Sequence, residues 1–453
     1  MRALLLVAAI ALAACGGGAG QTGSSGGEPA GTTGGGHSAS TGSVGSTGSN
    51  ASGTAAGGTG RASSTGGRGT AASTGGPAAS SGGGSSTGGT SSGAGSSNAG
   101  GSSGGAALWV TGYYTGWDSA SYPVSAVDFA ALTHVVVGPV LANSDGSLDT
   151  TFSLGNAGPA WAISAVEAAH AAGDVALLWV GGSDSESGFL GATSSANLFT
   201  FVANLQSAMA QFGADGLDLD WEPLAAADEA SFTALLQALR TAAPGAVLTM
   251  PVGALNMNLD TVDSFYPSVA AIVDQMNVMT YGMAGAWQGW QSWHSSPMSG
   301  ETGSTPESID TSVPAYLAAG VPAAKLGLGV GFFGLCYTPP VTGPKQDLGA
   351  STVAASDGVM SYTNIMANYY PSMTYTFDPS SQVPYLSASS PVGPSGCSYV
   401  TYDDASSVAA KAQYAKANGL GGTIIWELAE GYVPGGASGG NALLEALRTA
   451  FRQ

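Results

Sequence analysis

The chain is organised around one stretch of alternating acidic and apolar residues, Asp215-Gly216-Leu217-Asp218-Leu219-Asp220-Trp221-Glu222. If this stretch is a β-strand, Asp218, Asp220 and Glu222 share one face, because side chains two residues apart point the same way. The apolar side chains between them then lie on the opposite face. Buried and crowded carboxyls hold their protons to higher pH, which a general acid working near neutral pH requires. The pattern therefore favours a catalytic strand.

Two other interpretations of this stretch explain less of it. A solvated edge strand would leave Leu217, Leu219 and Trp221 in water, although apolar side chains gain from burial. A calcium loop of the EF-hand kind needs its glycine after the first acids, whereas Gly216 precedes them.

The first residues are typical of an export signal. Residues 1–15 hold Arg2, an apolar run too short to span a bilayer, and the ending Leu12-Ala13-Ala14-Cys15. This ending resembles a bacterial lipobox, which would make Cys15 the lipidated first residue of the mature protein. Ordinary cleavage after a small residue is the alternative. We expect an extracytoplasmic protein, anchored to the bacterial cell envelope or surface through Cys15 or released outside the cell.

Residues 16–105 consist almost wholly of Gly, Ser, Thr and Ala. Such a segment cannot bury enough apolar surface to offset the entropy of ordering, so we expect a disordered linker. A Gly/Ser coil of this length reaches about 50 Å root-mean-square. That reach suits a tether that holds a domain away from a membrane, and equally a plain spacer.

Residues 106–453 carry the large aromatic side chains and the hydrophobic periodicity, enough for one large domain with an insertion or for two smaller ones. The whole chain has a formal net charge of −19, and the residues before position 106 contribute +2, which leaves −21 on this part. Such acidity disfavours nucleic acids and fits a neutral or cationic substrate. Cys336 and Cys397 either form a disulfide, which export permits, or remain buried thiols.

Short apolar runs alternate with amphipathic helical patterns along this part of the chain. Residues 231–240 place apolar side chains at helical spacing, and Ser194 is positioned to cap the helix that follows it. Such alternation indicates βα units and a parallel sheet. Eight repeats predict a closed (β/α)8 TIM barrel, an α/β fold whose active residues lie at the carboxyl ends of the strands. The predicted strands are 108–114, 133–140, 175–181, 215–221, 246–252, 275–281, 326–332 and 422–427.

A long connection separates the last two predicted strands. Residues 334–402 are rich in Tyr, Pro and Ser, whereas Ala405 to Asn418 has a helical pattern. Structureless loops of this length are uncommon in compact domains, so we predict a small α+β insertion at 334–402 beside the active site. Its aromatic side chains either contact a ligand or form the core of the insertion; they include Tyr362, Tyr369, Tyr375, Phe377 and Tyr385.

These motifs resemble glycoside hydrolase family 18, the chitinases, over nearly all of 108–440. The opening stretch looks like the family's D-x-x-D-x-D-x-E signature, and Asn277-Val-Met279-Thr-Tyr281 resembles its sixth-strand motif. Leu-Gly-Leu-Gly-Val-Gly-Phe-Phe-Gly at 326–334 is similar to the seventh strand. Residues 399–408 and 421–427 resemble the run into the eighth strand. The insertion matches the chitinase insertion domain in place.

The resemblance implies a chitinase that hydrolyses β-1,4 bonds of N-acetylglucosamine polymers with retention of configuration. The nucleophile would be the substrate's own N-acetyl group, which closes to an oxazolinium ion. Glu222 would protonate the glycosidic oxygen and later deprotonate the attacking water. Asp220 would hydrogen-bond the acetamido nitrogen, and Asp218 would share a proton or charge with Asp220. Tyr281 would hold the acetamido oxygen.

Aromatic residues near the strand ends are candidates for sugar contacts. By the resemblance, Trp426 would form the floor under the sugar at the cleaved bond. Trp287, Trp290 and Trp293 cluster in a polar loop, where they either stack on sugars or pack the loop down. Trp117, after the first strand, is a similar candidate. The substrate-binding residues that we expect are Trp426, Tyr113, Met279, Trp287 and Asp215.

Two positions depart from the family pattern. Trp179 stands where the third-strand Ser-x-Gly-Gly has its serine, and Gly282 stands where the sixth-strand Met-x-Tyr-Asp has its aspartate. Both departures are expected to affect the subsites and the pH behaviour. His294 is isolated, and no His/Cys/Asp grouping has metal-ligand spacing, so we expect no metal and no other cofactor.

Three other functions compete with the chitinase hypothesis. An endo-β-N-acetylglucosaminidase acting on glycans also resembles this family, but the insertion at 334–402 favours a chitinase. A catalytically inactive chitin-binding lectin is disfavoured because Glu222 is present. A structural envelope lipoprotein would explain Cys15 and the linker but not the acids. We expect a monomer that binds chitin or N-acetylglucosamine oligosaccharides, no nucleic acid, and a membrane only through the lipid at Cys15.

Overall fold

The protein is described by a computed structural model that covers residues 108–256, 259–436 and 438–452. The predicted signal peptide with Cys15 and the predicted linker at 16–105 lie outside the described residues. Within the described ranges, none of the helices combines the length and the apolar character that crossing a membrane would need.

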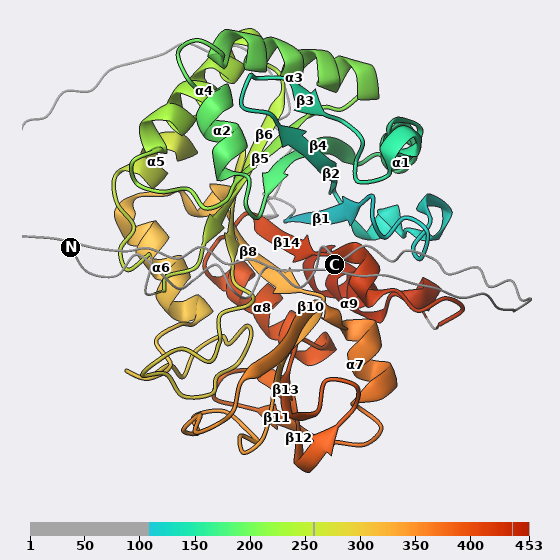
Figure 1. Cartoon of the computed structure of the whole chain (residues 1–453), viewed down its shortest axis with the longest axis vertical. Helices are drawn as coiled ribbons and strands as arrows, with labels where there is room; N and C mark the ends of the chain where they lie inside the picture. The colour runs from blue at the N-terminus through green and yellow to red at the C-terminus, as the bar shows by residue number, and fades with distance from the viewer. Residues whose placement is uncertain (1–107, 257–258, 437, 453) are drawn as a thin grey trace, which may run out of the picture. The chain divides into compact units, whose positions relative to one another are not determined.

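Eight parallel strands close into a barrel in the order β1-β14-β8-β7-β6-β5-β4-β2, and β2 pairs with β1 to complete it (Figure 1). This arrangement confirms the predicted (β/α)8 fold. A short strand, β3 (Leu148–Asp149), extends β2 as an antiparallel hairpin. The barrel strands are β1 (Trp109–Thr115), β2 (His134–Ala142), β4 (Val175–Gly182), β5 (Gly216–Trp221), β6 (Val247–Gly253), β7 (Gln275–Met279), β8 (Leu326–Gly331) and β14 (Gly422–Trp426).

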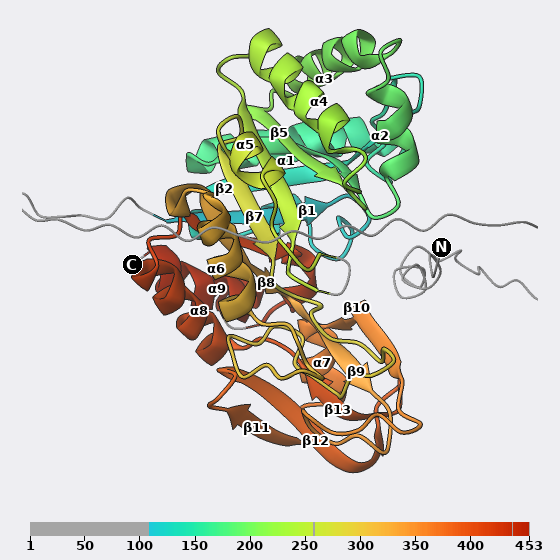
Figure 2. The ribbon, with the colours of Figure 1, turned by 90° about the vertical axis from the view of Figure 1, so that its left-hand side faces the viewer.

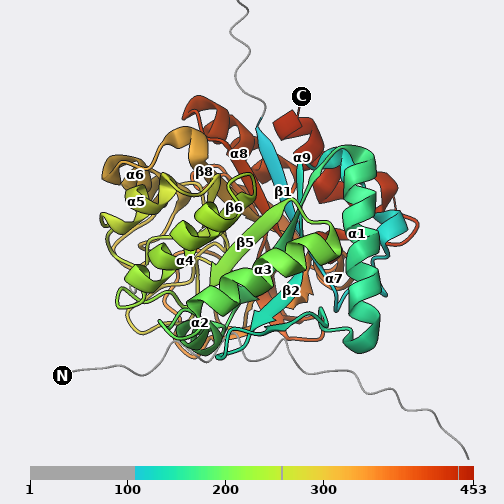
Figure 3. The same ribbon diagram turned by 90° about the horizontal axis from the view of Figure 1, so that it is seen from above.

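Helices surround the strands on the outside of the barrel (Figure 3). The connection from β1 to β2 differs from the others, since it holds 3-10 turns at Val124–Ala126 and Phe129–Ala131. The last helix, α9, packs against this connection and β1. The helices around the barrel are α1 (Gly158–Ala172), α2 (Glu186–Ala192), α3 (Leu198–Phe212), α4 (Glu229–Ala242), α5 (Phe265–Ala270), α6 (Ile309–Ala319), α8 (Ala405–Ala417) and α9 (Ala442–Arg452).

The helix that carries Phe232 forms as its spacing predicted, but the predicted cap of α3 is wrong. Asn197 precedes α3, and no side-chain hydrogen bond caps the helix. The Ser194 hydroxyl donates instead to the Gly191 carbonyl, at 2.7 Å. Ser194 therefore closes the turn after α2.

The strands bury both of their faces, and alternation decides which side chain enters the barrel. On β5, Leu217, Leu219 and Trp221 pack into the core between strands and helices. Asp218 and Asp220 point the other way, into the barrel, where they are 1% and 4% exposed. The alternation expected for this strand is confirmed.

The insertion forms an antiparallel sheet in the order β10-β9-β13-β12-β11 (Figure 2). A disulfide joins Cys336 to Cys397 on neighbouring strands, which decides between the alternatives for these cysteines. Tyr369 is buried in the insertion's own core. The elements are β9 (Phe333–Tyr337), β10 (Val353–Ser361), α7 (Tyr362–Asn368), β11 (Thr374–Asp378), β12 (Val383–Val392) and β13 (Cys397–Thr401).

Candidate active site

Asp218 is the deepest acid of the predicted catalytic strand. Its carboxylate accepts hydrogen bonds from the Tyr113 hydroxyl, at 2.7 Å, and from the Thr249 hydroxyl. Burial raises the pKa of Asp218 to about 6, against the opposing effect of these two hydrogen bonds. Side chains from β1 and β6 therefore hold Asp218 in one orientation.

Asp220 lies one step closer to the carboxyl end of the strand. The Trp179 indole N–H donates to Asp220 Oδ2 at 2.9 Å. The other oxygen, Oδ1, is buried and has no donor partner among the described residues. Burial, and then the charges of Glu222 and Asp218, raise the pKa of Asp220 well above its ordinary value.

Glu222 is half-buried just beyond the end of β5. Ser185 fixes the backbone here, because its hydroxyl accepts from the Glu222 N–H at 3.0 Å and donates to the Asp220 carbonyl at 3.1 Å. Burial raises the pKa of Glu222, a hydrogen bond with the Asp220 carboxyl opposes this rise, and the charge of Asp184 adds to it. Two carboxyls bond only when one carries a proton, so the pair holds one proton over a range of pH.

Tyr281 follows β7 and brings a hydroxyl to the same group. Burial, followed by the negative charges of Glu222, Asp220 and Asp218, raises the pKa of Tyr281 well above its usual range. The hydroxyl therefore keeps its proton and remains a hydrogen-bond donor. Its ring is half-buried and packs edge-on against Phe333, with ring centres 5.8 Å apart.

Trp426 ends β14 as a half-buried indole ring. Its N–H donates to Asp357 of the insertion, at 2.9 Å, which ties the barrel to β10. The Trp426 ring contacts Tyr113 and Trp179, with ring centres 5.3 and 5.2 Å apart. Trp117, 45% exposed, packs on Trp179 with ring centres 5.7 Å apart. Aromatic rings thus lie directly beside the acids.

Three of the expected substrate-binding residues contact other protein side chains, and their contact with a sugar stays a prediction. Tyr113 is only 2% exposed, and its hydroxyl donates to Asp218 at 2.7 Å. Met279 is half-buried against the residues inside the barrel. Trp287 is half-buried against Trp290, with ring centres 4.6 Å apart, and none of the described contacts joins it to the acids.

Asp215 was expected to contact substrate, and the structure contradicts this. It lies before the amino end of β5, where its carboxylate accepts from the Ala176 N–H at 2.8 Å and bonds His170 at 2.9 Å. Since a strand rises about 3.3 Å per residue, Asp215 is roughly 20 Å from Glu222 along the chain. Asp215 is a structural residue at the opposite end of the barrel.

The tryptophan cluster after β7 mainly packs its loop. Trp293 is fully buried and donates its N–H to the Glu307 carbonyl at 2.7 Å, and Trp290 is also buried. His294 is buried as well and bonds Asp378 of the insertion at 3.0 Å. Among the described residues, no group of His, Cys, Asp or Glu is arranged to hold a metal ion.

The two departures from the family pattern have different consequences. Trp179 replaces the serine of the third strand with another hydrogen-bond donor, which reaches Asp220. Gly282 has a φ of +63°, and a Cβ there would meet no described atom within 4 Å. The absence of the aspartate thus leaves open space next to the Gly282 backbone.

A second group of acids lies near the ends of β1 and β14. Glu427 accepts from the Thr115 hydroxyl at 2.6 Å, and burial, followed by the hydrogen bond and charge of Asp118, raises the pKa of Glu427 well above its ordinary value. Glu430 Oε2 is buried without a described partner.

Sequence reasoning missed Thr249, Ser185 and Asp357 as partners of the site. Thr249 pairs with Asp218 across the β5–β6 ladder, so correct strand order and register would have indicated it. Asp357 lies on the insertion, and no pattern in the sequence places it beside Trp426.

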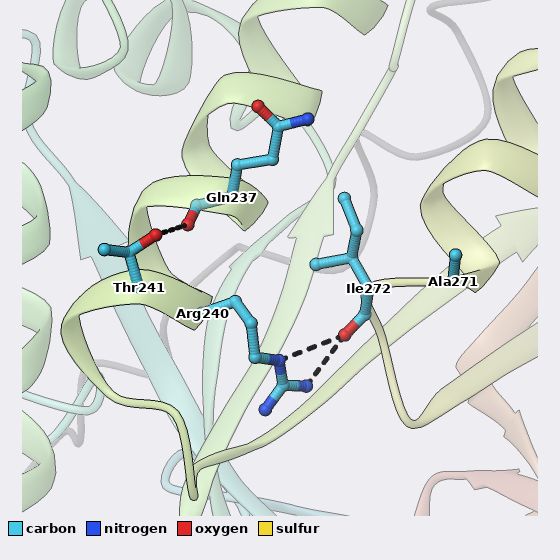
Figure 4. A pocket seen from close by; sticks show the side chains of 5 residues that line it. All are labelled: Gln237, Arg240, Thr241, Ala271 and Ile272. Carbon is cyan, nitrogen blue, oxygen red and sulfur yellow. Dashed lines mark hydrogen bonds between the residues drawn. The ribbon is translucent and has the colours of Figure 1, made fainter.

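Two surface hollows lie away from this site. One, of about 360 Å³, is lined by Gln237, Arg240, Thr241, Ala271 and Ile272 (Figure 4). Its polar groups bond one another, since Arg240 donates to the Ile272 carbonyl at 2.8 Å and to the Ala246 carbonyl at 2.7 Å. The other lies beside Asp215. Both adjoin segments that lead into the amino ends of strands, whereas barrel chemistry is located at the carboxyl ends.

Comparison with known proteins agrees with this geometry. Chitinase A1 of Niallia circulans is 32% identical over 270 residues, which cover 52% of this chain and 38% of that protein. A chitinase-like effector of Moniliophthora roreri is 26% identical over 384 residues, 72% of this chain and 90% of the effector. The chain thus spans well under half of the first relative and most of the second.

Solved structures share the fold. The Group IV chitinase of Ostrinia furnacalis superposes with a TM-score of 0.67 at 24% identity, covering 76% of this chain and 100% of that chain. Its complex with allosamidin gives 0.65 at 25% identity, covering 76% and 98%. The family model described as Glycosyl hydrolases family 18 matches residues 110–431, most of the chain. The protein belongs to glycosyl hydrolases family 18.

Proposed function

We propose that this protein is a chitinase, acting as a monomer, that hydrolyses β-1,4 bonds of N-acetylglucosamine polymers with retention of configuration. The observation that carries the proposal is the pair formed by Asp220 and Glu222. One proton shared by a buried and a half-buried carboxyl supplies an acid and a charge side by side, and no described donor reaches Asp220 Oδ1. The N–H of an acetamido group would satisfy that acceptor.

In the first step, Glu222 gives its proton to the glycosidic oxygen while the bond from that oxygen to the anomeric carbon breaks. The acetamido oxygen of the same sugar attacks the anomeric carbon from the opposite side, forming the oxazolinium ion. The Asp220 carboxylate accepts from the acetamido N–H and stabilises the positive charge. The Tyr281 hydroxyl donates a hydrogen bond to the acetamido oxygen and positions it. The raised pKa of Tyr281 keeps the hydroxyl protonated, as this donation requires.

In the second step, Glu222 removes a proton from water, and the water oxygen opens the oxazolinium ring at the anomeric carbon. The acetamido oxygen attacks from the face opposite the leaving group, and water then attacks from the face that the leaving group occupied, so two inversions keep the β configuration. The half-buried Trp426 ring suits the C–H face of the sugar. Asp218, fixed by Tyr113 and Thr249, keeps a carboxyl behind Asp220 through both steps.

The relatives support a chitin substrate. Chitinase A1 is named for that activity, and the Ostrinia structure is a chitinase in complex with allosamidin. The Moniliophthora relative is named a chitinase-like effector. For this reason, chitin binding without hydrolysis remains the competing function.

The test is hydrolysis of N-acetylglucosamine oligomers by the full chain. We expect release of shorter oligomers, with β anomers first, and a fall in kcat of about 10³-fold in Glu222→Gln, the range for loss of a general acid. Glu229→Gln, on the outer helix α4, is the matched control and should keep wild-type activity.

The other outcomes are equally specific. Binding of oligomers without any turnover would identify a binding protein instead of an enzyme. Cleavage of glycoprotein glycans but not of chitin oligomers would identify an endo-β-N-acetylglucosaminidase. Early α anomers would exclude retention.

We also propose that the domain works outside the cytoplasm, held to the envelope by a lipid at Cys15. The support is the sequence of residues 1–105, an apolar run ending at Leu-Ala-Ala-Cys before a long Gly/Ser tether. In a bacterial host, labelled palmitate should appear in the wild-type protein and be absent from Cys15→Ser, which should leave the membrane fraction. Equal labelling of both proteins would contradict the anchor.

A further inference from the structure

The contact between Trp179 and Asp220 sets which carboxyl oxygen can carry a proton. The indole N–H lies 2.9 Å from Asp220 Oδ2. An indole N–H donates and never accepts, whereas a hydroxyl can do both. An Oδ2 that carries the proton would accept this N–H more weakly than an ionised Oδ2 does. The indole therefore favours Oδ1 as the site of any proton on Asp220.

Oδ1 is also the oxygen that remains open. Among the described residues no N–H or O–H donor reaches this buried oxygen, and the hydrogen bond between Asp220 and Glu222 needs a proton on one of the two carboxyls. Because the indole binds Oδ2, Oδ1 is available to other groups. In the free protein it can hold the proton shared with Glu222, and with a sugar bound it can accept from the acetamido N–H. A serine hydroxyl in the same place would accept a hydrogen bond from a protonated Oδ2 as readily as it donates one to an ionised Oδ2.

The indole is held firmly enough to impose this choice. A Cβ at Gly138 would lie 2.6 Å from Trp179 Cβ, and a Cβ at Gly182 would lie 2.6 Å from Trp179 Cζ2. Both glycines therefore let neighbouring backbone approach the ring closely. On its remaining sides the ring contacts Tyr113, at 5.6 Å between ring centres, and Trp426, at 5.2 Å. A ring enclosed in this way cannot turn its N–H away from Asp220.

We propose that Trp179 is a positioning residue that binds Asp220 through Oδ2, holds it in one orientation, and confines its proton to the side facing Glu222. The inference rests on the proposed function for its catalytic consequence. The hydrogen-bond restriction itself is a property of the free protein and can be tested without substrate.

The titration of Asp220 depends on the groups that face it. On its own strand these are Glu222 and Asp218; Tyr113 comes from β1 and Tyr281 from β7. Asp184, after β4, acts on Glu222. Removing the indole N–H leaves all of these groups in place and withdraws one interaction that favours the charged form of Asp220.

The test replaces Trp179 by 3-benzothienylalanine, which keeps the ring shape and substitutes sulfur for the N–H. We expect the carboxyl ¹³C titration of Asp220, assigned by its absence in Asp220→Asn, to move up by about one pH unit. The acidic limb of the kcat/KM profile should move in the same direction. We expect kcat to fall about 10-fold and KM to change by less than about 3-fold, because the stacked rings remain.

Trp221 provides a matched control on the neighbouring strand. Its indole N–H is buried without a described partner, and its ring packs on Phe189 on the outer side of β5, with ring centres 4.8 Å apart. The same replacement at Trp221 should leave both titrations unchanged. Trp179→Phe is a second variant that removes the donor and should reproduce the upward shift.

An unchanged Asp220 titration after replacement of Trp179 would overturn this inference, whatever the enzyme does. A shift of equal size at Trp221 would also overturn it, since the effect would then come from repacking. Failure of the wild type to hydrolyse chitin oligomers would refute the proposed function, and the titration in the free protein would still decide the role of Trp179.

Discussion

Asp220 is 4% exposed and stands between two other carboxyls. Because burial, followed by the charges of Glu222 and Asp218, raises its pKa well above its ordinary value, the folded protein holds a proton that the unfolded chain releases near pH 3.9. Between these two pKa values the native state binds more protons, so stability falls as the pH rises. At neutral pH, the arrangement that favours acid catalysis is therefore a cost to the fold.

Asp220→Asn should consequently raise the melting temperature by a few degrees at pH 7, while chitin hydrolysis is lost. The amide oxygen can still accept from Trp179, so the fold keeps that hydrogen bond. The gain should shrink toward pH 4, where the unfolded chain also begins to bind this proton. Calorimetry from pH 4 to 8 measures it.

The control for this prediction is Asp260→Asn, which changes an exposed carboxylate. Its melting temperature should stay within about one degree of wild type, as surface substitutions usually do. A melting temperature of Asp220→Asn at or below wild type at every pH would show that burial of this carboxyl costs the fold nothing.

Single residues of the site were predictable to different degrees. Alternation along β5 was enough to place Asp218 and Asp220 on the inner face, because a strand offers only two faces. The hydrogen bond from Trp179 to Asp220 was not predictable, since it depends on the orientation of the indole ring between β4 and β5. Asp357 was missed for a similar reason: its φ of +48° and its contact with Trp426 arise from tertiary packing.

At the scale of elements, the barrel strands were predictable and the loops were not. The structure has β1 at Trp109–Thr115 and β14 at Gly422–Trp426, within one residue of the predicted ranges. Strands that are buried on both faces consist of continuous apolar runs. Such a run can be recognised in the sequence without knowing how the strand pairs with its neighbours. The segment from β1 to β2 has no such run and forms 3-10 turns.

The loop that carries Trp287, Trp290 and Trp293 shows that a polar sequence does not predict exposed side chains. Trp293 has polar neighbours in the sequence but is fully buried, because its partners come from the insertion and from the segment before α6. No local pattern contains those partners. Trp287 remains the one of the three tryptophans that is half-buried, and its contact with sugar stays a prediction.

At the scale of the whole molecule, buried polar contacts join the insertion and α8 to the barrel. Lys411 of α8 is fully buried; its ammonium group lies 2.5 Å from the Asp403 carboxylate and donates to the Ser296 hydroxyl at 2.6 Å. Ser296 donates in turn to the Thr280 carbonyl, next to Tyr281. Burial lowers the pKa of Lys411, and the charge of Asp403 opposes this effect. The network thus runs from α8 to Tyr281, for which we propose a role in positioning substrate.

Lys411→Met should break this network at its centre. The substitution leaves the Asp403 carboxylate buried without its cation, which costs about 3–5 kcal/mol when a buried pair loses one partner. Denaturant unfolding at pH 7 measures the loss. We expect the deficit to diminish on acidification, since protonation of the stranded carboxyl removes the uncompensated charge. We also expect a lower kcat, because Ser296 loses a hydrogen bond and Thr280 supports Tyr281.

The matched control is Lys416→Met on the same helix. Lys416 is exposed and donates to the Ala450 carbonyl at 2.7 Å, so its loss should cost no more than about 0.5 kcal/mol. If Lys411→Met were as stable as Lys416→Met, the buried pair would contribute nothing to the fold. If stability fell while kcat stayed at the wild-type level, the path from α8 to Tyr281 would be purely structural. A joint loss of stability and kcat would show that the insertion and α8 hold the acetamido-binding end of β7 in place.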